Sequence, residues 1–450
     1  MAAVVLWYRR WRAVGREPVA ALRSEDTSER ITNVNRTIFW CLGLVPLALA
    51  AGCSEQLGWV ESGPASGSDV RVTNLRCEYL SEPLAIDSTR PRLSWVLESE
   101  RRGVRQVAYQ IRAASSPAAL GEADLWDTGR VESAAQNQIE WAGKPLGSGQ
   151  IVVWQVRVWT DGQAEPSPWS KVAGFRMGLL EPADWKAKWI GVPVELPETK
   201  PYPPQPAMQV RKEFELKGPV RRAIAHVSAL GLYELRLNGR RVGDHILAPE
   251  WTNYHKRIQY QTYDVTELLR TGANAVGATV AEGWYAGKIG ISFIQGQDDP
   301  RRGHYGRRLR LIAQIEVEYR DGSKELIVTD ESWRGTTEGP VRVADLLDGE
   351  TYDARREMPG WDRPGFAADN WVAVDVGNEV KGVLTAQPNE PIRVTERLRP
   401  VKVTEPSPGV YVVDFGQVLA GRCRIRIRGE AGQQIELRHA EVLKDDGNIY

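Results

Sequence analysis

From Val70 to the end of the chain, hydrophobic and polar residues alternate with a period of two, and helical periodicity is almost absent. In the first part of this region the alternation is clearest in three runs separated by turn residues, namely 92–97, 106–112 and 152–159. About seven such strands in roughly 100 residues predict a fibronectin-III-like β-sandwich over 70–178. We expect Trp95 and Trp154, which lie within these runs, in its core.

A second alternating unit spans 207–376 and follows a proline-rich stretch, 179–206, which we interpret as a linker. Asn238-Gly239 is a strong hairpin-turn signal between two strands of this unit. Residues 265–270 are typical of a short helical turn, and longer alternating strands follow them. This succession of antiparallel strands predicts a jelly-roll β-sandwich.

A third β-unit begins at residue 399, after a connector over 377–398. Its clearest strand is 421–428, where isoleucines alternate with arginines as in a half-buried strand. About 50 residues and a few strands are too little for an independent sandwich, so we interpret 399–450 as a truncated one. The predicted fold class is therefore all-β, with consecutive β-sandwich domains: fibronectin-III-like, then jelly-roll-like, then incomplete.

The N-terminal region contains one long apolar run, 38–51, which is 14 residues long. This is too short to span about 30 Å of hydrocarbon, but it suits the hydrophobic core of a signal peptide. Small residues and then Cys53 follow it, an arrangement similar to the lipobox of bacterial lipoproteins. We predict that 1–53 is a lipoprotein-type signal segment with Cys53 as the lipidated residue. The alternative is an ordinary signal peptide in which the cysteine is incidental.

The sequence upstream of this run, 1–33, is mixed in character and unlike the start of a signal peptide. A start at Val34 would leave a well-proportioned lipoprotein signal, so one hypothesis is that Met1 lies upstream of the true start codon. Residues 54–69 are rich in Gly, Ser and Pro and are typical of a tether. These features together predict an exported lipoprotein, anchored by lipid to a bacterial membrane, in the periplasm or at the cell surface.

The composition excludes some classes of function and favours others. The chain has 58 Lys+Arg and 58 Asp+Glu, and this zero net charge argues against a nucleic-acid partner. Its four cysteines are too few for a disulfide framework and do not have zinc-site spacing. The 17 Trp and 14 Tyr against only 6 Phe are amphipathic aromatics of the kind that line sugar-binding faces, although sandwich cores also use Trp.

A series of short strings, in order along the chain, resembles the N-terminal half of the bacterial α-L-rhamnosidases, an inverting glycoside hydrolase family. These strings are 87–95, 125–131, 185–191, 237–244, 247–254, 259–266, 282–287, 349–355, 360–362, 414–417 and 437–443. The resemblance implies a rhamnose-containing carbohydrate as partner. It also implies that the catalytic acid and base lie on a helical α/α barrel that follows the β-domains. No position of this chain matches such a residue, so we predict no catalytic residue here and expect this chain alone to be inactive.

Sugar binding is the chemistry that the β-units favour, because a carbohydrate site combines a stacking aromatic ring with short polar side chains. Two loops supply these residue types: Trp251, Asn253 and Tyr254 in one, and Glu282, Trp284 and Tyr285 in the other, where Gly283 and Gly287 allow close approach of a ligand. The resemblance adds that the second unit is similar to a rhamnose-binding module that calcium assists in some members. We predict no cofactor and leave calcium open.

The function that these observations favour is that of an accessory, substrate-recognition region of an α-L-rhamnosidase that releases terminal α-L-rhamnosyl residues from glycosides and polysaccharides. Two alternatives stay open. One is a stand-alone rhamnose-binding module at the cell surface. The other is a fragment without function, because an incomplete third unit leaves open strand edges that promote aggregation. The oligomeric state is not predicted.

Overall fold

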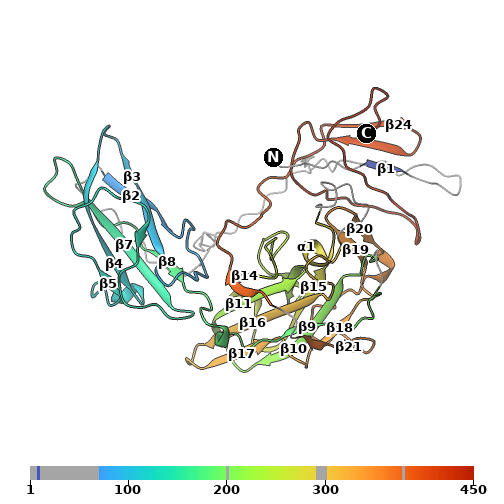
Figure 1. The fold of residues 1–450 in the computed structure, drawn as a ribbon, viewed down its shortest axis with the longest axis horizontal. Coiled ribbons are helices and arrows are strands. Elements are labelled where there is room, and N and C mark those ends of the chain that lie inside the picture. Colours follow the sequence, from blue (N-terminus) through green and yellow to red (C-terminus); the bar gives the residue numbers. More distant parts are fainter. Residues whose placement is uncertain (1–7, 11–69, 199–201, 290–301, 378–380, 450) are drawn as a thin grey trace, which may run out of the picture. The chain divides into compact units, whose positions relative to one another are not determined.

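The computed structural model describes residues 8–10, 70–198, 202–289, 302–377 and 381–449 (Figure 1). The predicted lipidation residue Cys53, nearly all of the signal segment and the tether lie outside these residues. The chain divides into two compact units, Trp59–Arg393 and a smaller one that contains Val394–Tyr450. In the part of the chain that is described, no helix is both long enough and apolar enough to cross a membrane.

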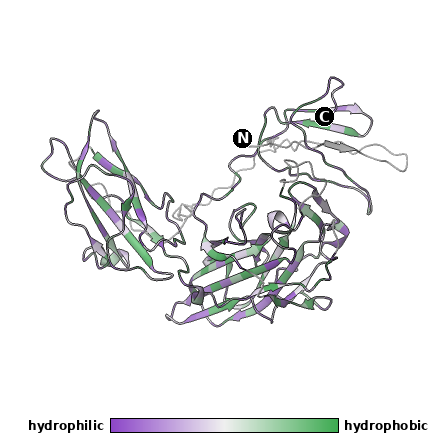
Figure 2. Cartoon of the chain, in the orientation of Figure 1, coloured by the Kyte–Doolittle hydropathy of each residue, from purple (hydrophilic) through white to green (hydrophobic). Residues whose placement is uncertain are grey.

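The first sandwich of the larger unit packs a three-stranded sheet against a four-stranded one. The first sheet has the order β2 (Val70–Cys77), β3 (Arg92–Ser99), β6 (Ile139–Glu140). The second has the order β5 (Trp126–Asp127), β4 (Gln106–Ala114), β7 (Ile151–Thr160), β8 (Ala173–Arg176), and η1 (Pro117–Ala119) follows β4 in the chain. Figure 2 shows hydrophobic and hydrophilic residues alternating along these strands.

The core of this sandwich contains Trp95 and Trp154, as predicted, and both are buried. The indole N–H of Trp95 donates to Oε1 of Gln106 at 3.0 Å. A buried donor of this kind needs an acceptor, because an unpaired N–H in the core would cost free energy. Trp95 also packs edge-to-face on Tyr109, with ring centroids 5.3 Å apart.

The second sandwich also has two sheets. One has the order β13 (Arg240–Arg241), β12 (Leu232–Leu237), β15 (Gly272–Ala281), β10 (Met208–Leu216), β18 (Arg334–Thr336), β21 (Val372–Ala373). The other has the order β22 (Asp375–Gly377), β9 (Trp189–Gly191), β16 (Arg310–Tyr319), β11 (Val220–Leu230), β14 (Arg257–Asp264), β23 (Val383–Ala386), with β17 (Lys324–Val328) also paired to β16.

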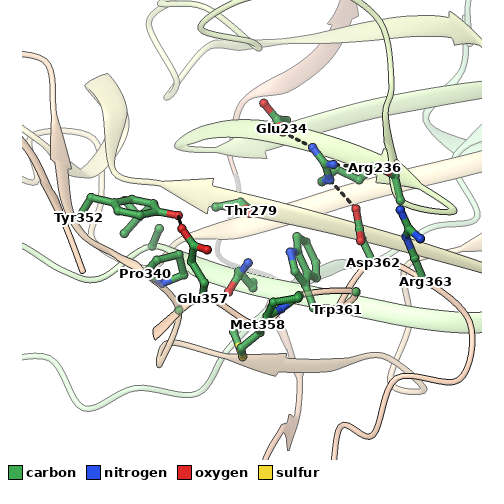
Figure 3. Close-up of a pocket in the computed structure, with 17 residues that line it drawn as sticks. Glu234, Arg236, Thr279, Pro340, Tyr352, Glu357, Met358, Trp361, Asp362 and Arg363 are labelled. Atoms are coloured by element: carbon green, nitrogen blue, oxygen red, sulfur yellow. Dashed lines mark hydrogen bonds and ion pairs between the residues drawn. The ribbon is translucent and has the colours of Figure 1, made fainter. Parts of the chain in front are cut away.

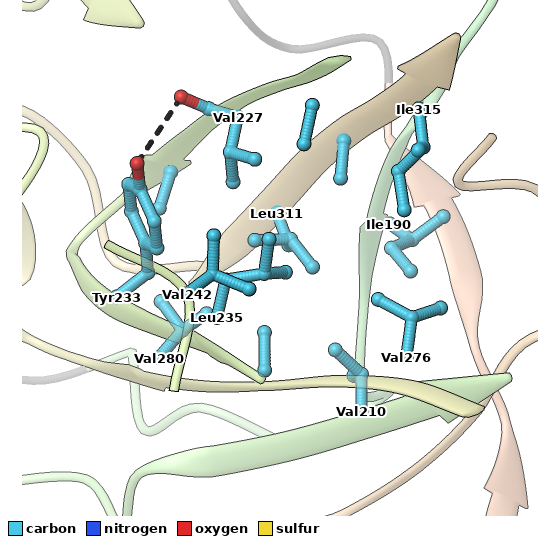
Figure 4. Packing of buried hydrophobic residues seen from close by; sticks show 14 of the residues in the cluster. Ile190, Val210, Val227, Tyr233, Leu235, Val242, Val276, Val280, Leu311 and Ile315 are labelled. Carbon is cyan, nitrogen blue, oxygen red and sulfur yellow. Dashed lines mark hydrogen bonds between the residues drawn. The ribbon is translucent and has the colours of Figure 1, made fainter. Parts of the chain in front are cut away.

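Inward-facing side chains of both sheets form one hydrophobic core (Figure 4). Val210, Leu235 and Val276 come from the first sheet, and Val227 and Leu311 from the second. Alternate positions on each strand face this core, which is the arrangement that a period of two produces in a sandwich. The prediction of consecutive β-sandwich domains is confirmed for these two.

The predicted turns of the second sandwich form as the sequence indicates. Asn238 and Gly239 have φ values of 51° and 84° and join β12 to β13, with Leu237 opposite Arg240. Two positive φ values in a two-residue loop match the twist of a hairpin, and Asn-Gly tolerates them. The predicted helical turn at 265–270 is the 3₁₀ helix η3 (Thr266–Leu268).

Two segments that we predicted as connections contribute strands to the second sandwich. The predicted linker 179–206 contains η2 (Pro182–Asp184) and β9, and β9 pairs with both β16 and β22. The predicted connector 377–398 contains β23, which pairs in parallel with β14. These strands have 3 and 4 residues, too few for a period of two to be visible in the sequence.

The second sandwich also contains a hairpin and three short helices outside its two sheets. The hairpin consists of β19 (Val341–Asp345) and β20 (Gly349–Tyr352). Besides η3, the helices are α1 (Gly283–Ala286) and η5 (Ala354–Arg356). Among the described residues, α1 is the only α-helix.

The smaller unit contains β24 (Lys402–Ser407) and β25 (Val410–Asp414), and β25 also pairs with β1 (Tyr8–Arg10). The predicted strand over 421–428 is absent, and the side chains of Ile425 and Ile427 are 46% and 43% exposed. An alternating segment becomes a strand only where a neighbouring strand satisfies its backbone and another layer covers its apolar face. The described residues supply neither for this segment.

Candidate functional site

The structure brings the two aromatic loops of the sequence prediction together. Trp251 lies in the loop before β14, and Trp284 lies in α1. Their rings are stacked, with centroids 6.0 Å apart and planes inclined by 7°. The indole N–H of Trp251 donates to the hydroxyl of Tyr305 at 3.2 Å. Trp251 is nevertheless 46% exposed, so its ring is fixed in orientation while much of its surface is free.

Two of the predicted residues, Tyr254 and Tyr285, are buried next to this stacked pair. Their ring centroids are 5.4 Å apart, and the hydroxyl of Tyr254 donates to the carbonyl of Glu250 at 2.8 Å. Burial raises the pKa of Tyr254 well above its ordinary value. These two rings therefore support the loops from within, and Trp251 is the most exposed of the four predicted aromatic residues.

Asn253 is exposed and organises the turn beside Trp251. Its side-chain oxygen accepts from the backbone N–H of His255 at 3.2 Å. Its carbonyl accepts from the backbone N–H groups of Lys256 and Arg257. The amide nitrogen of an Asn that uses only its side-chain oxygen locally can donate to a hydroxyl group of a ligand.

Glu282 is fully buried and forms an ion pair with Arg302. Arg302 also binds Asp345 at 3.1 Å and Asp348 at 2.6 Å. Burial raises the pKa of Glu282 to about 7, although the hydrogen bond and charge of Arg302 and the backbone N–H of Gln205 act to lower it. In the described part of the chain, no hydrogen bond reaches its second oxygen.

This arrangement connects α1 to the β19–β20 hairpin and does not place the Glu282 carboxylate on the surface. No group of three or more His, Cys, Asp or Glu side chains among the described residues could hold a metal ion. Calcium thus stays an open prediction.

A cleft with a volume of about 750 Å³ lies elsewhere on this sandwich, on the outer face of the sheet that contains β10, β12 and β15 (Figure 3). Its floor includes Gln209, Glu234, Arg236 and Thr279. These positions alternate with residues of the hydrophobic core, so their side chains point outward. The loop 357–363 and the end of the β19–β20 hairpin form its wall.

An arginine on the floor of the cleft holds two acids in place. Nε of Arg236 donates to Oδ2 of Asp362 at 2.5 Å, and Nη1 donates to Oε1 of Glu234 at 2.9 Å. Burial disfavours the charged guanidinium, but the hydrogen bonds and charges of the two carboxylates outweigh it and raise the pKa of Arg236. The guanidinium therefore holds the two carboxylates in a fixed arrangement.

Aromatic rings stand at two places along the cleft, Trp361 and Tyr352 (Figure 3). Trp361 stacks on Trp371 with centroids 6.0 Å apart, and it covers Gly277 of β15 so closely that a Cβ at that position would lie 2.5 Å from Cζ3 of the indole. Tyr352 is half exposed, and its hydroxyl donates to Oε1 of Glu357 at 2.8 Å.

The sequence prediction did not include this cleft. Tyr352 and the residues Trp361 and Asp362 belong to two of the family-like strings, 349–355 and 360–362, but a string does not state which surface its residues face. The alternation along β12 could have indicated the floor of the cleft. Glu234 and Arg236 alternate with core residues on this strand, which predicts that both side chains lie on the outer face of the sheet.

Three family models match the chain in order. They are the Rha78A-like N-terminal immunoglobulin domain over 72–181, the α-L-rhamnosidase N-terminal domain over 218–396 and the bacterial α-L-rhamnosidase concanavalin-like domain over 404–450. The matched regions are domains of the α-L-rhamnosidase family. Together they correspond to the N-terminal portion of these enzymes.

Several α-L-rhamnosidases are similar to this chain. That of Streptomyces avermitilis is 34% identical, with 85% of this chain matching 52% of that protein. A crystal structure of the Streptomyces avermitilis enzyme complexed with L-rhamnose aligns with a TM-score of 0.78 at 33% identity and also covers 85% and 52% of the two chains.

The Aspergillus terreus α-L-rhamnosidase aligns with a TM-score of 0.75 at 34% identity, over 85% of this chain and 42% of that one. A curated α-L-rhamnosidase of Formosa agariphila is 35% identical over 83% of this chain and 40% of its own length. The chain thus spans about half, or less, of the length of the α-L-rhamnosidases it matches.

Proposed function

We propose that residues 70–450 are the accessory, substrate-recognition region of an α-L-rhamnosidase that acts on terminal α-L-rhamnosyl residues of glycosides and polysaccharides. The observation that carries this proposal is the match of three rhamnosidase family models in order along the chain. The alignment to the N-terminal portion of an enzyme with bound L-rhamnose supports the choice of sugar.

Within this region, we propose that the loops around Trp251 contact the sugar. The apolar face of a deoxyhexose would stack on the exposed surface of the Trp251 indole, which Trp284 holds in one orientation. A ring that is already immobile loses little conformational entropy when a ligand binds. Asn253, exposed in the same turn, would donate from its amide to a hydroxyl of the sugar.

Isothermal titration calorimetry with L-rhamnose and a neutral rhamnan oligosaccharide tests this contact. We expect Trp251→Ala to weaken binding by about tenfold, because it removes the stacking surface. Leu326→Ala, at a residue of β17 that is 39% exposed, is the control and should bind as the wild type does. Equal affinities of Trp251→Ala and the wild type would contradict the assignment of the loops.

We also propose that residues 70–450 do not break the glycosidic bond themselves. The proposal is supported by the absence of any match between their acids and the family's catalytic carboxylates, which the resemblance assigns to a helical barrel. The test is an assay of the purified chain on p-nitrophenyl α-L-rhamnoside. We expect no turnover above the buffer control, and turnover that follows the protein through purification would refute the proposal.

For location, we propose export and lipidation at Cys53, which rest on the apolar run and the small residues before this cysteine. Labelling of the expressing cells with a radioactive fatty acid tests this. Label should enter the wild-type chain and not the Cys53→Ser variant. Label in both, or in neither, would rule out Cys53 as the lipidation residue.

A further inference from the structure

We infer that the cleft on the outer face of the β12–β15–β10 sheet is a second carbohydrate-binding site, separate from the Trp251 loops, and that it takes a neutral oligosaccharide. The residues that line it belong to different elements from those of the loops: strands β10, β12 and β15, the β19–β20 hairpin and the loop 357–363. With a volume of about 750 Å³, the cleft has room for more than a single small ring.

The side chains that line the cleft fit a ligand rich in hydroxyl groups. Glu234, Arg236 and Asp362 are held by mutual ion pairs, so their remaining lone pairs and N–H groups are fixed in direction. Planar carboxylate and guanidinium groups arranged in this way can each bind neighbouring hydroxyls of one sugar. Trp361 and Tyr352 add apolar ring surface, which the C–H faces of a pyranose require.

The charge of the lining favours a neutral ligand over an acidic one. Three carboxylates face the cleft, Glu234, Glu357 and Asp362, and the two guanidinium groups are those of Arg236 and Arg363. Arg236 is already neutralised by its carboxylate partners. A uronic acid placed here would therefore meet a surplus of negative charge, since like charges at short distance repel.

One buried oxygen atom of the lining has no hydrogen-bond partner among the residues that the structure describes. Gln209 is only 6% exposed, and its Oε1 is buried with no hydrogen bond among the described residues. It lies beside Gly339, where any Cβ would collide with that oxygen. A buried amide oxygen without a donor costs free energy, and a small displacement of this side chain toward a sugar hydroxyl in the cleft would satisfy it.

The test uses the full chain and titration calorimetry with a neutral rhamnan oligosaccharide and, separately, L-rhamnose. The inference rests on the proposed function only for this choice of probe. We expect Tyr352→Ala to weaken binding of the oligosaccharide by about tenfold and to leave the affinity for L-rhamnose at the Trp251 loops unchanged. Tyr79→Ala is the matched control, because Tyr79 and Tyr352 are each 50% exposed and Tyr79 lies on the first sandwich.

Trp361→Ala is a second variant, with its thermal unfolding measured in parallel because Trp361 also packs on Trp371. If both variants are folded and bind the oligosaccharide as the wild type does, the cleft is not a sugar site. Absence of oligosaccharide binding by the wild type overturns the inference as well. Tighter binding of a uronic-acid oligosaccharide than of the neutral one would overturn the assignment of ligand charge.

The two proposals fail in distinguishable ways. If Trp251→Ala abolishes all sugar binding while the cleft variants bind normally, the loop proposal stands and the cleft inference is wrong. If the cleft variants lose the oligosaccharide while Trp251→Ala retains it, the cleft is the binding site and the loop assignment fails.

Discussion

The two sandwiches of the larger unit use their outer aromatic residues differently. In the first sandwich, arginine side chains cover the rings on the outside of the sheet. The guanidinium of Arg157 lies 4.7 Å from the ring centroid of Trp169 and 5.3 Å from that of Trp159, and the guanidinium of Arg130 lies 4.8 Å from the centroid of Trp159. This alternation of rings and cations leaves little aromatic surface for a ligand.

In the second sandwich, comparable rings are packed on one side and open on the other. Trp251 stacks on Trp284, and Trp361 stacks on Trp371, but each still borders solvent or the cleft. A high content of Trp and Tyr therefore does not by itself identify a binding surface. What identifies it is whether a ring is held in place without being covered.

The largest expected effect comes from the core of the first sandwich. Trp154→Ala should lower the free energy of unfolding by about 3–5 kcal/mol, because it leaves a large cavity among β4, β7 and the opposite sheet. Trp251→Ala should cost less than about 1 kcal/mol, since nearly half of that side chain is already exposed. Denaturant titration followed by near-ultraviolet circular dichroism measures both, and similar losses would contradict the distinction between a core ring and an open one.

The second prediction concerns the pH dependence of stability that the buried carboxyl group of Glu282 causes. Because the pKa of Glu282 is raised to about 7 from 4.5, the folded chain binds a proton that the unfolded chain has lost throughout this interval. The stability that Glu282 contributes is therefore complete below about pH 4.5 and is lost as the pH rises through about 7.

Glu282→Gln isolates this contribution from that of other groups, such as His226, whose burial lowers its pKa to about 3. As the pH rises from about 4.5 to 7, the stability of the wild type should fall relative to that of Glu282→Gln. Unfolding midpoints of both proteins across this range provide the measurement. Curves that remain parallel would show that the carboxyl group does not titrate in this window.

The smallest effect is expected from the arginines over the first sandwich. Arg157→Ala should cost about 1 kcal/mol, because it removes the cation from between Trp159 and Trp169. Arg71→Ala is the control on the same sandwich, since its ion pair with Glu98 is solvent-exposed and should contribute almost nothing. If the two variants lose equal stability, the covering of the rings is not a stabilising feature of this face.

The sequence predicted the two sandwiches well, because a period of two persists wherever one face of a long strand is buried. The pairing of Leu237 with Arg240 across Asn238-Gly239 shows that turn chemistry also fixed the register locally. The short strands β9 and β23 escaped prediction for the opposite reason: three or four residues contain too little pattern. The segment 421–428 shows the converse error, since alternation alone does not create a strand partner.

For the candidate site, the sequence named two loops that the structure brings together, but it could not assign the roles of their residues. Trp251 and Tyr254 are aromatic residues of one loop, yet one is half exposed and the other is buried. Which ring faces outward depends on the packing of α1 and Tyr305, which are distant in the sequence. The cleft was missed because its residues come from five separate elements, and only the folded sheet aligns them.

Strands β9 and β23 also determine where this sandwich can be cut. β9 pairs with β16 at Leu311, and β23 pairs with β14 over Arg257–Tyr260. A recombinant piece limited to 207–376 would lack both and would present unpaired backbone N–H and C=O groups along these strands, which invites intermolecular pairing. A recombinant version of the second sandwich should therefore retain at least 186–392, so that β16 and β14 keep the short strands that pair with them.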